Sequence, residues 1–394
     1  MSQPQPKALD TSSQSNLFEL AQIFLSLGAT SFGGPAAHVA LMEDEFVARR
    51  KWLERDQFLA LAASTHFIPG PNSTELALHI GYLRAGRLGL LVSGIAFILP
   101  AACLVWVLGW VYLTYGALPQ TTTLLSIIKP VVVAVVAQAT SRFALSVVRT
   151  VELGCLAVAA FLASALGAPE LQTLAVAAII TGLVARLKGS ASGSSSLSVA
   201  IWPFPKFAGI SFAGSAASAS AQGLPLFFIF LKIGSVVFGS GYVLLVFLRS
   251  ELVEKLGIIS EAQLLDAIAV GQITPGPLFT SATFIGYLLD GSQGALLATV
   301  GIFLPAFLLV VLTAPILARL RQSQLLLAIV TGLNAASVGL MLLVTIQLAE
   351  GALVDRVSIV CFLGAVLLLV RFNVRGSMLI AAGFALGLIR CFVG

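Results

Sequence analysis

Long apolar stretches separated by short polar turns run along almost the whole chain, and none of them alternates with the period of two that marks a β-strand. A helix needs about 20 mostly apolar residues to cross a bilayer, so stretches of this kind are typical of membrane helices. The pattern predicts an all-α polytopic membrane protein with about 10–12 membrane segments. The stretches lie near residues 17–42, 57–83, 88–115, 124–148, 151–167, 171–187, 222–248, 262–289, 294–318, 324–349, 356–370 and 376–393.

The second half of the chain repeats the pattern of the first. The stretch 24–34 returns at 230–240, and Pro69-Gly70-Pro71 returns as Pro275-Gly276-Pro277, each with a shift of 206 residues. One residue is missing further on, so that Pro100 matches Pro305. Two tandem apolar repeats, each interrupted by Gly and Pro, indicate a secondary transporter with its binding site between the halves.

Residues 188–221 separate the two repeats and differ from them in composition. They are rich in Ser, Gly and Ala and contain Pro203 and Pro205. This composition predicts a linker. We therefore expect an N-terminal transporter repeat at 1–187 and a C-terminal transporter repeat at 222–394.

The positions of Lys and Arg predict that the repeats are inverted. Basic turns at 84–87, 142–149 and 186–206 alternate with turns near 116–123 and 168 that lack Lys and Arg, which places the basic turns in the cytoplasm. The turn at Asp290 matches the turn at 84–87 but carries no Lys or Arg, so equivalent turns fall on opposite sides. To keep equivalent turns on opposite sides of the membrane, one of the two leading segments of each half must cross the membrane and the other must turn back. We expect the Pro-Gly-Pro segment to be the re-entrant one.

Composition supports this class of protein. Hydrophobic residues make up 58% of the chain and charged residues 10%, and the mean hydropathy is +1.01. Soluble domains carry about 25% charged residues. We therefore attribute the net charge of +5 to Lys and Arg in loops that set the orientation in the membrane. The lipid bilayer is the expected partner, and nucleic acid is not expected. The four cysteines have no ligand spacing, so no metal, cofactor or disulfide is expected.

The two Pro-Gly-Pro motifs are the strongest candidates for a binding site. Proline cannot continue a helix, and the backbone groups that it frees inside a membrane must face protein or a wet cavity. A helix that restarts after the motif aims its free N–H groups and its positive dipole end at that cavity, which favours an anion. The alternative is that Asn72 and Glu75 only cap the restarting helix. The candidate substrate-binding residues are Gly33, Gly34, Pro69, Gly70, Pro71, Asn72, Ser73, Thr74, Lys232, Gly239, Ser240, Thr274, Pro275, Gly276 and Pro277.

Ionisable residues within these segments are few. Lys232 lies about ten residues into its apolar stretch, where a cation is costly and is by default a candidate counter-charge for substrate; snorkelling to the interface is the alternative. Glu75 and His79 lie four residues apart on one helix face, and with His38 they are the candidates for proton coupling. Asp266 is a weaker acidic candidate in the second half, because it is close to the predicted membrane surface.

The loop at 43–52 mixes acidic and basic residues and ends at Trp52. It is read as an ion-paired interfacial loop with Trp52 as an anchor, and an electrostatic funnel for anions is the alternative. Glu45 and Glu251 are equivalent in the two repeats, which indicates a shared structural role. The sequence has no nucleotide-binding loop and no nucleophile motif, so we expect a transporter coupled to an ion gradient and not an enzyme.

At these motifs the chain resembles the chromate ion transporter family in its long, two-domain form. The matching stretches are Ser31-Phe32-Gly33-Gly34-Pro35-Ala36-Ala37-His38, Arg49-Arg50-Lys51-Trp52-Leu53, residues 68–75, His79-Ile80-Gly81-Tyr82, residues 230–234, residues 238–242 and residues 272–277. The second half departs from the first, since Ser240 stands in place of Gly34 and the Asn-Ser-Thr-Glu run is absent. The resemblance therefore does not imply two symmetric sites.

The resemblance implies export of chromate, a tetrahedral oxyanion, across the inner membrane as a multi-pass protein. The implied driver is the proton-motive force, the implied result is chromate resistance, and sulfate is the implied competitor. Transport of sulfate or another oxyanion, flipping of a lipid phosphate and a membrane assembly protein that transports nothing remain alternatives. A homodimer is an open alternative for the assembly.

Overall fold

A computed structural model describes residues 17–115, 119–190, 223–239 and 241–393, and these residues form helices without a strand among them. The predicted all-α class is confirmed. The predicted linker lies outside the described residues from 191 on, and the last helix of the first half continues to Ser190. The first half contains α1 (Leu17–Thr30), α2 (Pro35–Glu43), the π-helix η1 (Asp44–Arg49), α3 (Arg55–Ser64), the 3₁₀ turn η2 (Thr65–Phe67), α4 (Asn72–Tyr115), α5 (Pro119–Val147), α6 (Val151–Ala165) and α7 (Glu170–Ser190).

The second half has the same order of main helices. It contains α8 (Leu224–Val236), the 3₁₀ turn η4 (Gly241–Val243), α9 (Leu244–Leu248), the π-helix η5 (Arg249–Lys255), α10 (Glu261–Ile273), the 3₁₀ turn η6 (Leu278–Thr280), α11 (Ser281–Thr313), the 3₁₀ turn η7 (Ala314–Ile316), α12 (Leu317–Gln322), α13 (Gln324–Ala352), α14 (Arg356–Arg371) and α15 (Gly376–Val393). The short η7 and α12 are added between α11 and α13. Within the described residues, five helical stretches are long and apolar enough to cross a membrane. Shorter apolar helices accompany them at Leu17–Thr30, Val151–Ala165, Leu224–Val236 and Gly376–Ala385.

α4 and α11 are each a tight hairpin of two helices. In α4 the chain reverses at Ala85 and Gly86, where Gly86 has φ +60°, and α11 reverses in the same way at Asp290 and Gly291, with φ +53° at the glycine. Glycine adopts this left-handed backbone without the steric cost that a Cβ brings. The Ser93 hydroxyl donates to the Ala77 carbonyl at 3.0 Å and so ties the two arms of α4 together.

Both leading segments of the first half turn back on themselves. Glu19 at the start of α1 forms an ion pair with Arg50, just after η1, and the rings of Phe24 and Phe46 lie 5.3 Å apart. Trp52 lies just before α3, and Arg84 lies at the reversal of α4; the Arg84 guanidinium is 4.5 Å from the Trp52 ring. The Pro-Gly-Pro segment between these two residues therefore also turns back, as predicted.

The expectation that the first segment crosses completely is wrong. α1 ends at Thr30, and the chain passes through Gly33 and Gly34, with φ of +107° and +83°, before Pro35 starts α2. These backbone conformations reverse the chain, and proline at the first helical position suits the restart. The other glycine of this segment, Gly28, serves close packing instead, because α1 lies against the Phe97 backbone there.

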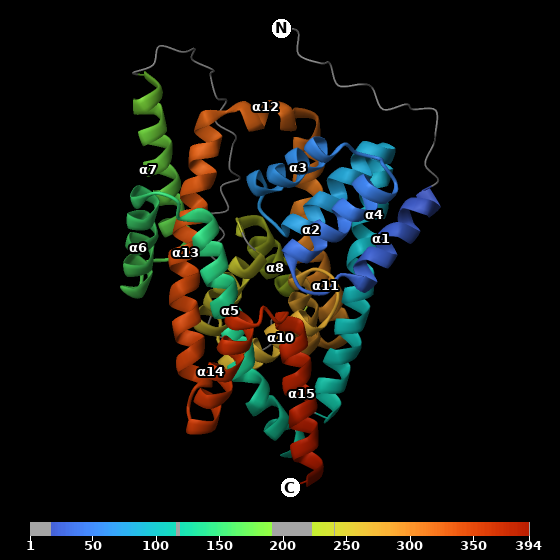
Figure 1. Cartoon of the computed structure of the whole chain (residues 1–394), viewed down its shortest axis with the longest axis vertical. Coiled ribbons are helices and arrows are strands. Elements are labelled where there is room, and N and C mark those ends of the chain that lie inside the picture. Colours follow the sequence, from blue (N-terminus) through green and yellow to red (C-terminus); the bar gives the residue numbers. More distant parts are fainter. Residues whose placement is uncertain (1–16, 116–118, 191–222, 240, 394) are drawn as a thin grey trace.

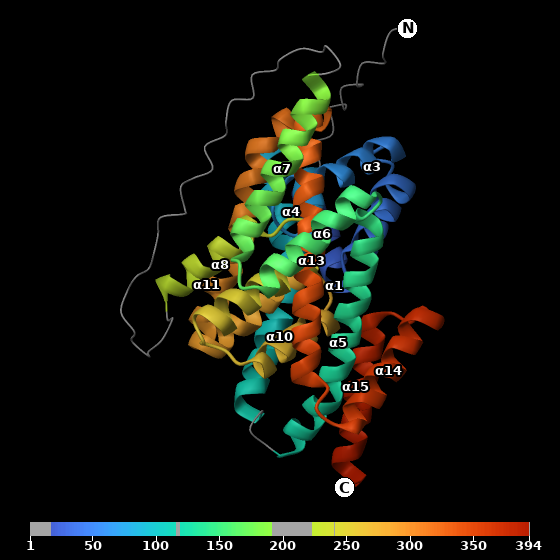
Figure 2. The same ribbon diagram turned by 90° about the vertical axis from the view of Figure 1, so that its left-hand side faces the viewer.

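Equivalent helices of the two halves run in opposite directions, which is the geometry that inverted repeats require. In Figures 1 and 2, α5 rises from the lower end of the molecule, whereas α13 descends from the upper end. α4 ends at the lower end, and α11 leads to α12 at the upper end. The hydroxyls of Thr140 and Thr345, which are 205 residues apart, lie 2.9 Å from each other where α5 meets α13.

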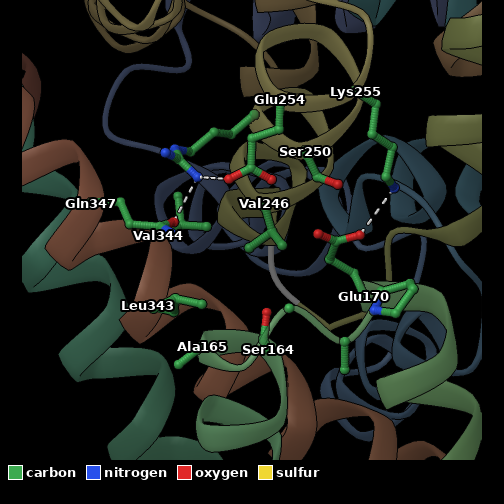
Figure 3. A pocket seen from close by; sticks show the side chains of 14 residues that line it. Ser164, Ala165, Glu170, Val246, Ser250, Glu254, Lys255, Leu343, Val344 and Gln347 are labelled. Carbon is green, nitrogen blue, oxygen red and sulfur yellow. Dashed lines mark hydrogen bonds and ion pairs between the residues drawn. The ribbon is translucent and has the colours of Figure 1, made fainter.

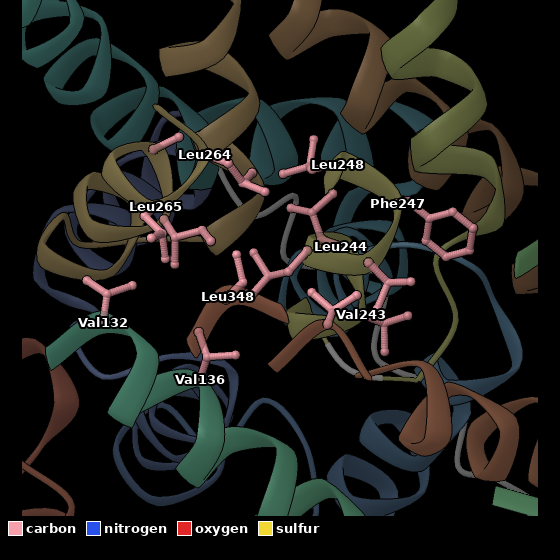
Figure 4. Packing of buried hydrophobic residues seen from close by; sticks show 14 of the residues in the cluster. Val132, Val136, Val243, Leu244, Phe247, Leu248, Leu264, Leu265 and Leu348 are labelled. Carbon is pink, nitrogen blue, oxygen red and sulfur yellow. The ribbon is translucent and has the colours of Figure 1, made fainter. Parts of the chain in front are cut away.

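The two halves interlock around α5 and α13. α5 packs against α14 and α15 of the other half, and α13 packs against α6 and α7 of the other half. Figure 4 shows part of the largest apolar cluster, in which Val132 and Val136 of α5 face Leu244 and Leu348 of the second half. The repeats predicted from the sequence therefore share one core.

Candidate functional site

The broken segments of the two halves meet at two equivalent hydrogen bonds. The Gly70 N–H donates to the Val237 carbonyl at 2.8 Å, and the Gly276 N–H donates to the Ser31 carbonyl at 2.9 Å. Each bond joins the Pro-Gly-Pro motif of one half to the unwound segment between the first two helices of the other half. The four breaks that the sequence predicts therefore lie together, between the repeats.

Asn72, the first residue of α4, extends this contact between the halves. Its Nδ2 donates to the Gly239 carbonyl at 2.8 Å and lies 3.0 Å from Nδ1 of His66. Its Oδ1, the atom that would cap the helix, is buried without a hydrogen-bond partner among the described residues. The local-capping alternative for Asn72 is therefore wrong, because the side chain points to the other repeat.

His38 joins the two broken segments of the first half. Its Nε2 lies 3.1 Å from the Ser31 carbonyl and its Nδ1 lies 3.1 Å from the Ser73 hydroxyl. A carbonyl can only accept, so Nε2 carries a proton, and a neutral ring then accepts from Ser73 at Nδ1. The Ser31 carbonyl thus accepts hydrogen bonds from both His38 Nε2 and the Gly276 N–H.

Glu75 lies at the centre of a group of buried polar atoms that lack partners. The side chain has no exposed surface, it lies against Gly70, and neither carboxylate oxygen has a hydrogen bond within the described part of the chain. Nε2 of His79, one helical turn further along, is likewise buried without a hydrogen-bond partner among the described residues. Buried polar groups are nearly always hydrogen-bonded, so each exception calls for a functional or structural reason. Other unpartnered atoms near the breaks are Ser31 Oγ, Asn72 Oδ1 and Thr74 Oγ1.

The second Pro-Gly-Pro motif offers fewer free donors than the first. Thr274 donates to the Val270 carbonyl at 3.0 Å, Thr280 to the Pro277 carbonyl at 2.9 Å, and Ser281 to the Leu278 carbonyl at 2.8 Å. These hydroxyls serve their own helix ends and are not available to a ligand in this conformation. The two motifs are therefore equivalent in their backbone but not in the side-chain donors that they offer to a ligand.

Residues from the opposite half flank the predicted glycines. Gly34 faces the Tyr242 hydroxyl, and Gly239 lies against the Asn334 side chain and the Phe143 ring. Arg142, next to Phe143 on α5, donates to the Asn373 side chain at 3.3 Å. The sequence analysis did not identify Tyr242, Asn334 or Arg142 as site residues. A polar side chain within an apolar helix is the signal that could have identified Asn334. Ser240 lies outside the described residues.

Lys232 is not among the residues that the structure brings to the Pro-Gly-Pro motifs. Its Nζ lies 2.8 Å from Oε2 of Glu251, whose other oxygen lies 2.8 Å from Nζ of Lys255. Burial acts to raise the pKa of Glu251, but the hydrogen bonds from the two lysines outweigh it and hold the pKa below its usual value. The charge predicted to face substrate is thus neutralised by a carboxylate, and the Lys232 side chain is 47% exposed.

Equivalent ion pairs fix both π-helices. Glu45 in η1 lies 3.7 Å from Arg49, and Glu251 in η5 lies 2.8 Å from Lys255, the residue equivalent to Arg49; this agrees with the shared structural role expected of these two glutamates. The rest of the 43–52 loop is also ion-paired or packed, with the ring of Trp52 stacked on Phe46 at 5.2 Å. The loop has the ion-paired structure that we favoured over the electrostatic funnel.

A cavity of about 350 Å³ lies elsewhere, between the turn at 164–170, η5 and α13. Its charged groups pair with one another: Figure 3 shows Lys255 beside Glu170, and Arg249 forms an ion pair with Glu254. None of the predicted substrate or proton-coupling residues lines it. In the part of the chain that the structure describes, no cluster of His, Cys, Asp or Glu is placed to hold a metal ion.

Asp266 is buried inside the protein. Its side chain is 3% exposed, and Oδ2 accepts a hydrogen bond from the Tyr112 hydroxyl at 2.8 Å. It lies on α10, the helix that leads into the second Pro-Gly-Pro motif. Asp266 is thus enclosed by protein, and its position near the membrane surface stays a prediction.

Comparison with known proteins agrees with the two-repeat organisation. The chain matches the chromate transporter family over residues 18–186 and again over 224–388. It is 30% identical to the chromate transport protein of Cupriavidus metallidurans over 98% of this chain and 97% of that protein, and 30% identical to the chromate transport protein of Pseudomonas aeruginosa over 83% of this chain and 80% of that protein. A shorter match, 36% identical over 21% of this chain, covers 47% of the uncharacterized transporter YwrA of Bacillus subtilis.

No solved structure matches the chain. The family match covers both repeats and leaves out mainly the region between them. With breaks from both halves joined around buried polar groups, and with helices long enough to cross a membrane several times, this multi-pass membrane protein belongs to the chromate transporter family.

Proposed function

We propose that this chain exports chromate from the cytoplasm across the inner membrane, driven by the proton-motive force, and so confers chromate resistance. The observation that carries the proposal is the reciprocal pair of hydrogen bonds, Gly70 to Val237 and Gly276 to Ser31, between the breaks of the two repeats. Alternating access requires a site at the interface of two units that move relative to one another, and these bonds lie at that interface.

The anion would bind at the start of α4. The first N–H groups of a helix have no partner within the helix, and they present a partial positive charge to an anion. Ser73 and Thr74 lie in this first turn, and Thr74 Oγ1 has no partner within the described residues. A tetrahedral oxyanion has four oxygens that accept such donors, which suits chromate and equally sulfate as a competitor.

Arg142 is our proposed counter-charge in place of Lys232. Lys232 is held by Glu251, whereas Arg142 lies on α5 beside Phe143, whose ring lies against Gly239 of the second break. The guanidinium also donates to the Asn373 side chain at 3.3 Å, a neutral partner that leaves its charge uncompensated by that contact. A planar guanidinium suits an oxyanion because it donates in a fork.

Glu75 is our proposed proton-coupling residue, with His79 and His38 beside it. A carboxylate buried without partners costs several kcal/mol when ionised, so Glu75 favours the protonated form in this conformation. A conformation that admits water or a cation would favour release of the proton. Binding and release would thereby depend on which side of the membrane the site faces. The repeats at 1–187 and 222–394 would be the two moving units, and a homodimer remains a prediction.

Transport of labelled chromate into inverted membrane vesicles tests the proposal. We expect uptake that depends on an imposed proton gradient and that added sulfate inhibits. Vesicles that contain the Asn72→Leu variant serve as a matched control, because this variant loses the contact with Gly239 but keeps the helices. Uptake no greater than in vesicles without the protein would refute chromate export, and uptake of sulfate with no effect of chromate would point to a sulfate transporter instead.

A further inference from the structure

The two contacts between the breaks of the repeats have the same backbone. We name the contact of Gly70 with Val237 the first crossing and the contact of Gly276 with Ser31 the second crossing. Their hydrogen bonds are alike, at 2.8 and 2.9 Å. A group that responds to protons at one crossing and not at the other must therefore be a side chain.

His66 is such a side chain at the first crossing. It lies three residues before Pro69, and its Nδ1 is 3.0 Å from Nδ2 of Asn72, which donates to the Gly239 carbonyl at 2.8 Å. A carbonyl can only accept, so this contact identifies the Asn72 atom that faces the ring as the amide nitrogen. An amide nitrogen can only donate, so Nδ1 of His66 is an unprotonated acceptor in this conformation.

A proton on Nδ1 of His66 conflicts with this arrangement. It makes both facing atoms donors, so the contact between His66 and Asn72 becomes repulsive. The Asn72 amide relieves the conflict by turning over, so that Oδ1 accepts from the protonated ring; Oδ1 is otherwise buried without a hydrogen-bond partner among the described residues. The same turn removes Nδ2 from the Gly239 carbonyl and places an oxygen against it. Protonation of His66 and the hydrogen bond from Asn72 to Gly239 therefore exclude each other.

The other two histidines lack this property. Nδ1 of His38 faces the Ser73 hydroxyl at 3.1 Å, and a hydroxyl can change from donor to acceptor without moving its oxygen. His38 and His79 are also buried, with 1% and 2% of their surface exposed, whereas His66 is exposed. Unwound backbone within a membrane must face protein or water, so an exposed histidine at a break is open to protons from water.

The surroundings of His66 leave Asn72 as the partner that responds to its proton. The turn η2, which contains His66, packs against α3, α4 and α13, and the Phe143 ring of α5 lies against Gly239. In the described part of the chain, the ionisable side chains of α3, of the first two turns of α4, of α13 and of α5 beside Phe143 form no hydrogen bond or ion pair with His66; they are Arg55, Asp56, Glu75, His79, Glu350 and Arg142.

The second crossing has neither member of this pair. Gln272 stands in place of His66, and the Tyr242 hydroxyl lies 3.5 Å from its Oε1. Leu278 stands in place of Asn72. Since neither Gln272 nor Leu278 takes up a proton near neutral pH, the second crossing lacks this response.

We infer that His66 is a positioning residue that makes the first crossing sensitive to protons. The neutral ring holds the Asn72 amide on Gly239, and the protonated ring turns the amide over and releases Gly239. The inference deepens the proposed proton-coupled export and rests on it for its use, because this crossing lies beside the start of α4, where we place the anion. Glu75 stays the proposed proton-coupling residue, while His66 controls whether the crossing is held.

The test follows the opening of each crossing in the purified full chain and needs no chromate. The four cysteines are replaced by serine, and a single cysteine is introduced by Val237→Cys at the first crossing or by Ser31→Cys at the second. The two positions are equivalent in the repeats, and both have 0% exposure. Labelling by a water-soluble maleimide is measured at pH values above and below about 6.5, the ordinary pKa of histidine. Each rate is divided by the rate of the same variant unfolded in SDS at the same pH, which removes the effect of pH on the thiol itself.

We expect acid to raise the relative labelling rate of Val237→Cys several-fold and to leave that of Ser31→Cys unchanged. His66→Gln gives the first crossing the residue that the second crossing has, an acceptor that stays neutral. Val237→Cys should then label slowly at both pH values. Asn72→Leu removes the amide through which His66 acts, so labelling should be fast at both pH values, with or without His66→Gln.

An acid effect on Val237→Cys that persists in His66→Gln overturns the inference, as does the absence of an acid effect in the parent. Fast labelling of His66→Gln at neutral pH also overturns it, because a neutral acceptor would then not be what holds Asn72. The labelling does not depend on transport. If chromate uptake fails while these rates behave as expected, the proposed export is refuted and the proton-sensitive crossing stands.

Discussion

Replacing Gly276 by alanine tests whether the joined breaks are as tightly packed as the structure indicates. Gly276 has φ +90°, and a Cβ there would lie 2.7 Å from the Ala101 Cβ and 3.4 Å from the Gly28 carbonyl oxygen. An L-residue in left-handed backbone costs about 1–2 kcal/mol, and overpacking a close-packed site costs about 1–3 kcal/mol. We expect Gly276→Ala to lower the free energy of unfolding by about 2–5 kcal/mol and to abolish chromate transport.

The steric and backbone contributions can be separated. Ala101→Gly removes the nearest atom, so the double variant should recover about 1–3 kcal/mol of the loss and part of the transport. Gly257→Ala is the matched control for the backbone alone, because Gly257 has φ +60° and nothing lies within 4 Å of its added Cβ. That control should lose only about 1–2 kcal/mol and keep full transport.

Thermal unfolding in detergent and chromate uptake into inverted vesicles, measured on the same preparations, provide the two readouts. The reasoning is refuted if Gly276→Ala unfolds at the same temperature as Gly257→Ala. It is also refuted if Ala101→Gly fails to restore any stability to Gly276→Ala, since the clash would then lie elsewhere.

Three further variants test the assignment of roles. Asn72→Leu removes the hydrogen bond to Gly239, a contribution of about 1 kcal/mol, so uptake should fall several-fold while the protein still inserts; unchanged uptake would argue against this contact. Glu75→Gln removes a titratable group, so uptake should become independent of the proton gradient, and uptake that still follows the gradient would exclude Glu75 as the coupling residue. Arg142→Gln should abolish uptake, whereas Lys232→Gln should change stability by less than about 1 kcal/mol and leave uptake intact; the reverse outcome, measured in the same vesicles, would restore Lys232 as the counter-charge.

The breaks could be predicted from the sequence because their cause is local. Pro69 and Pro275 cannot continue a helix whatever surrounds them, and the constant shift between the halves shows that both motifs belong to one repeated plan. The same local reasoning does not decide the role of Gly28, since a glycine in an apolar helix allows either a break or a close contact. Only the approach of the Phe97 backbone decides between these two roles.

The pairing of the site residues could not be predicted, because it depends on contacts between distant segments. Nothing in the sequence near Gly70 indicates that its N–H bonds to Val237 of the other half. The isolated position of Lys232 within an apolar stretch made it the obvious cation, but Glu251 returns to it through a π-helix whose register sequence patterns do not reveal. Asp266 was underrated for the related reason that its partner Tyr112 is 154 residues away in the chain.

The two repeats share a backbone plan but differ in their ionisable side chains. If both halves carried the same groups, the two ends of the transport path that we propose would respond alike to protons and to substrate. The buried acid beside the Pro-Gly-Pro motif belongs to the first half alone, where Glu75 stands in place of Ser281. The buried acid on α10 belongs to the second half alone, where Asp266 stands in place of Ala60. In the transport that we propose, inverted repeats would make the two end states similar in energy, and the asymmetric carboxyls would let protonation favour one of them over the other.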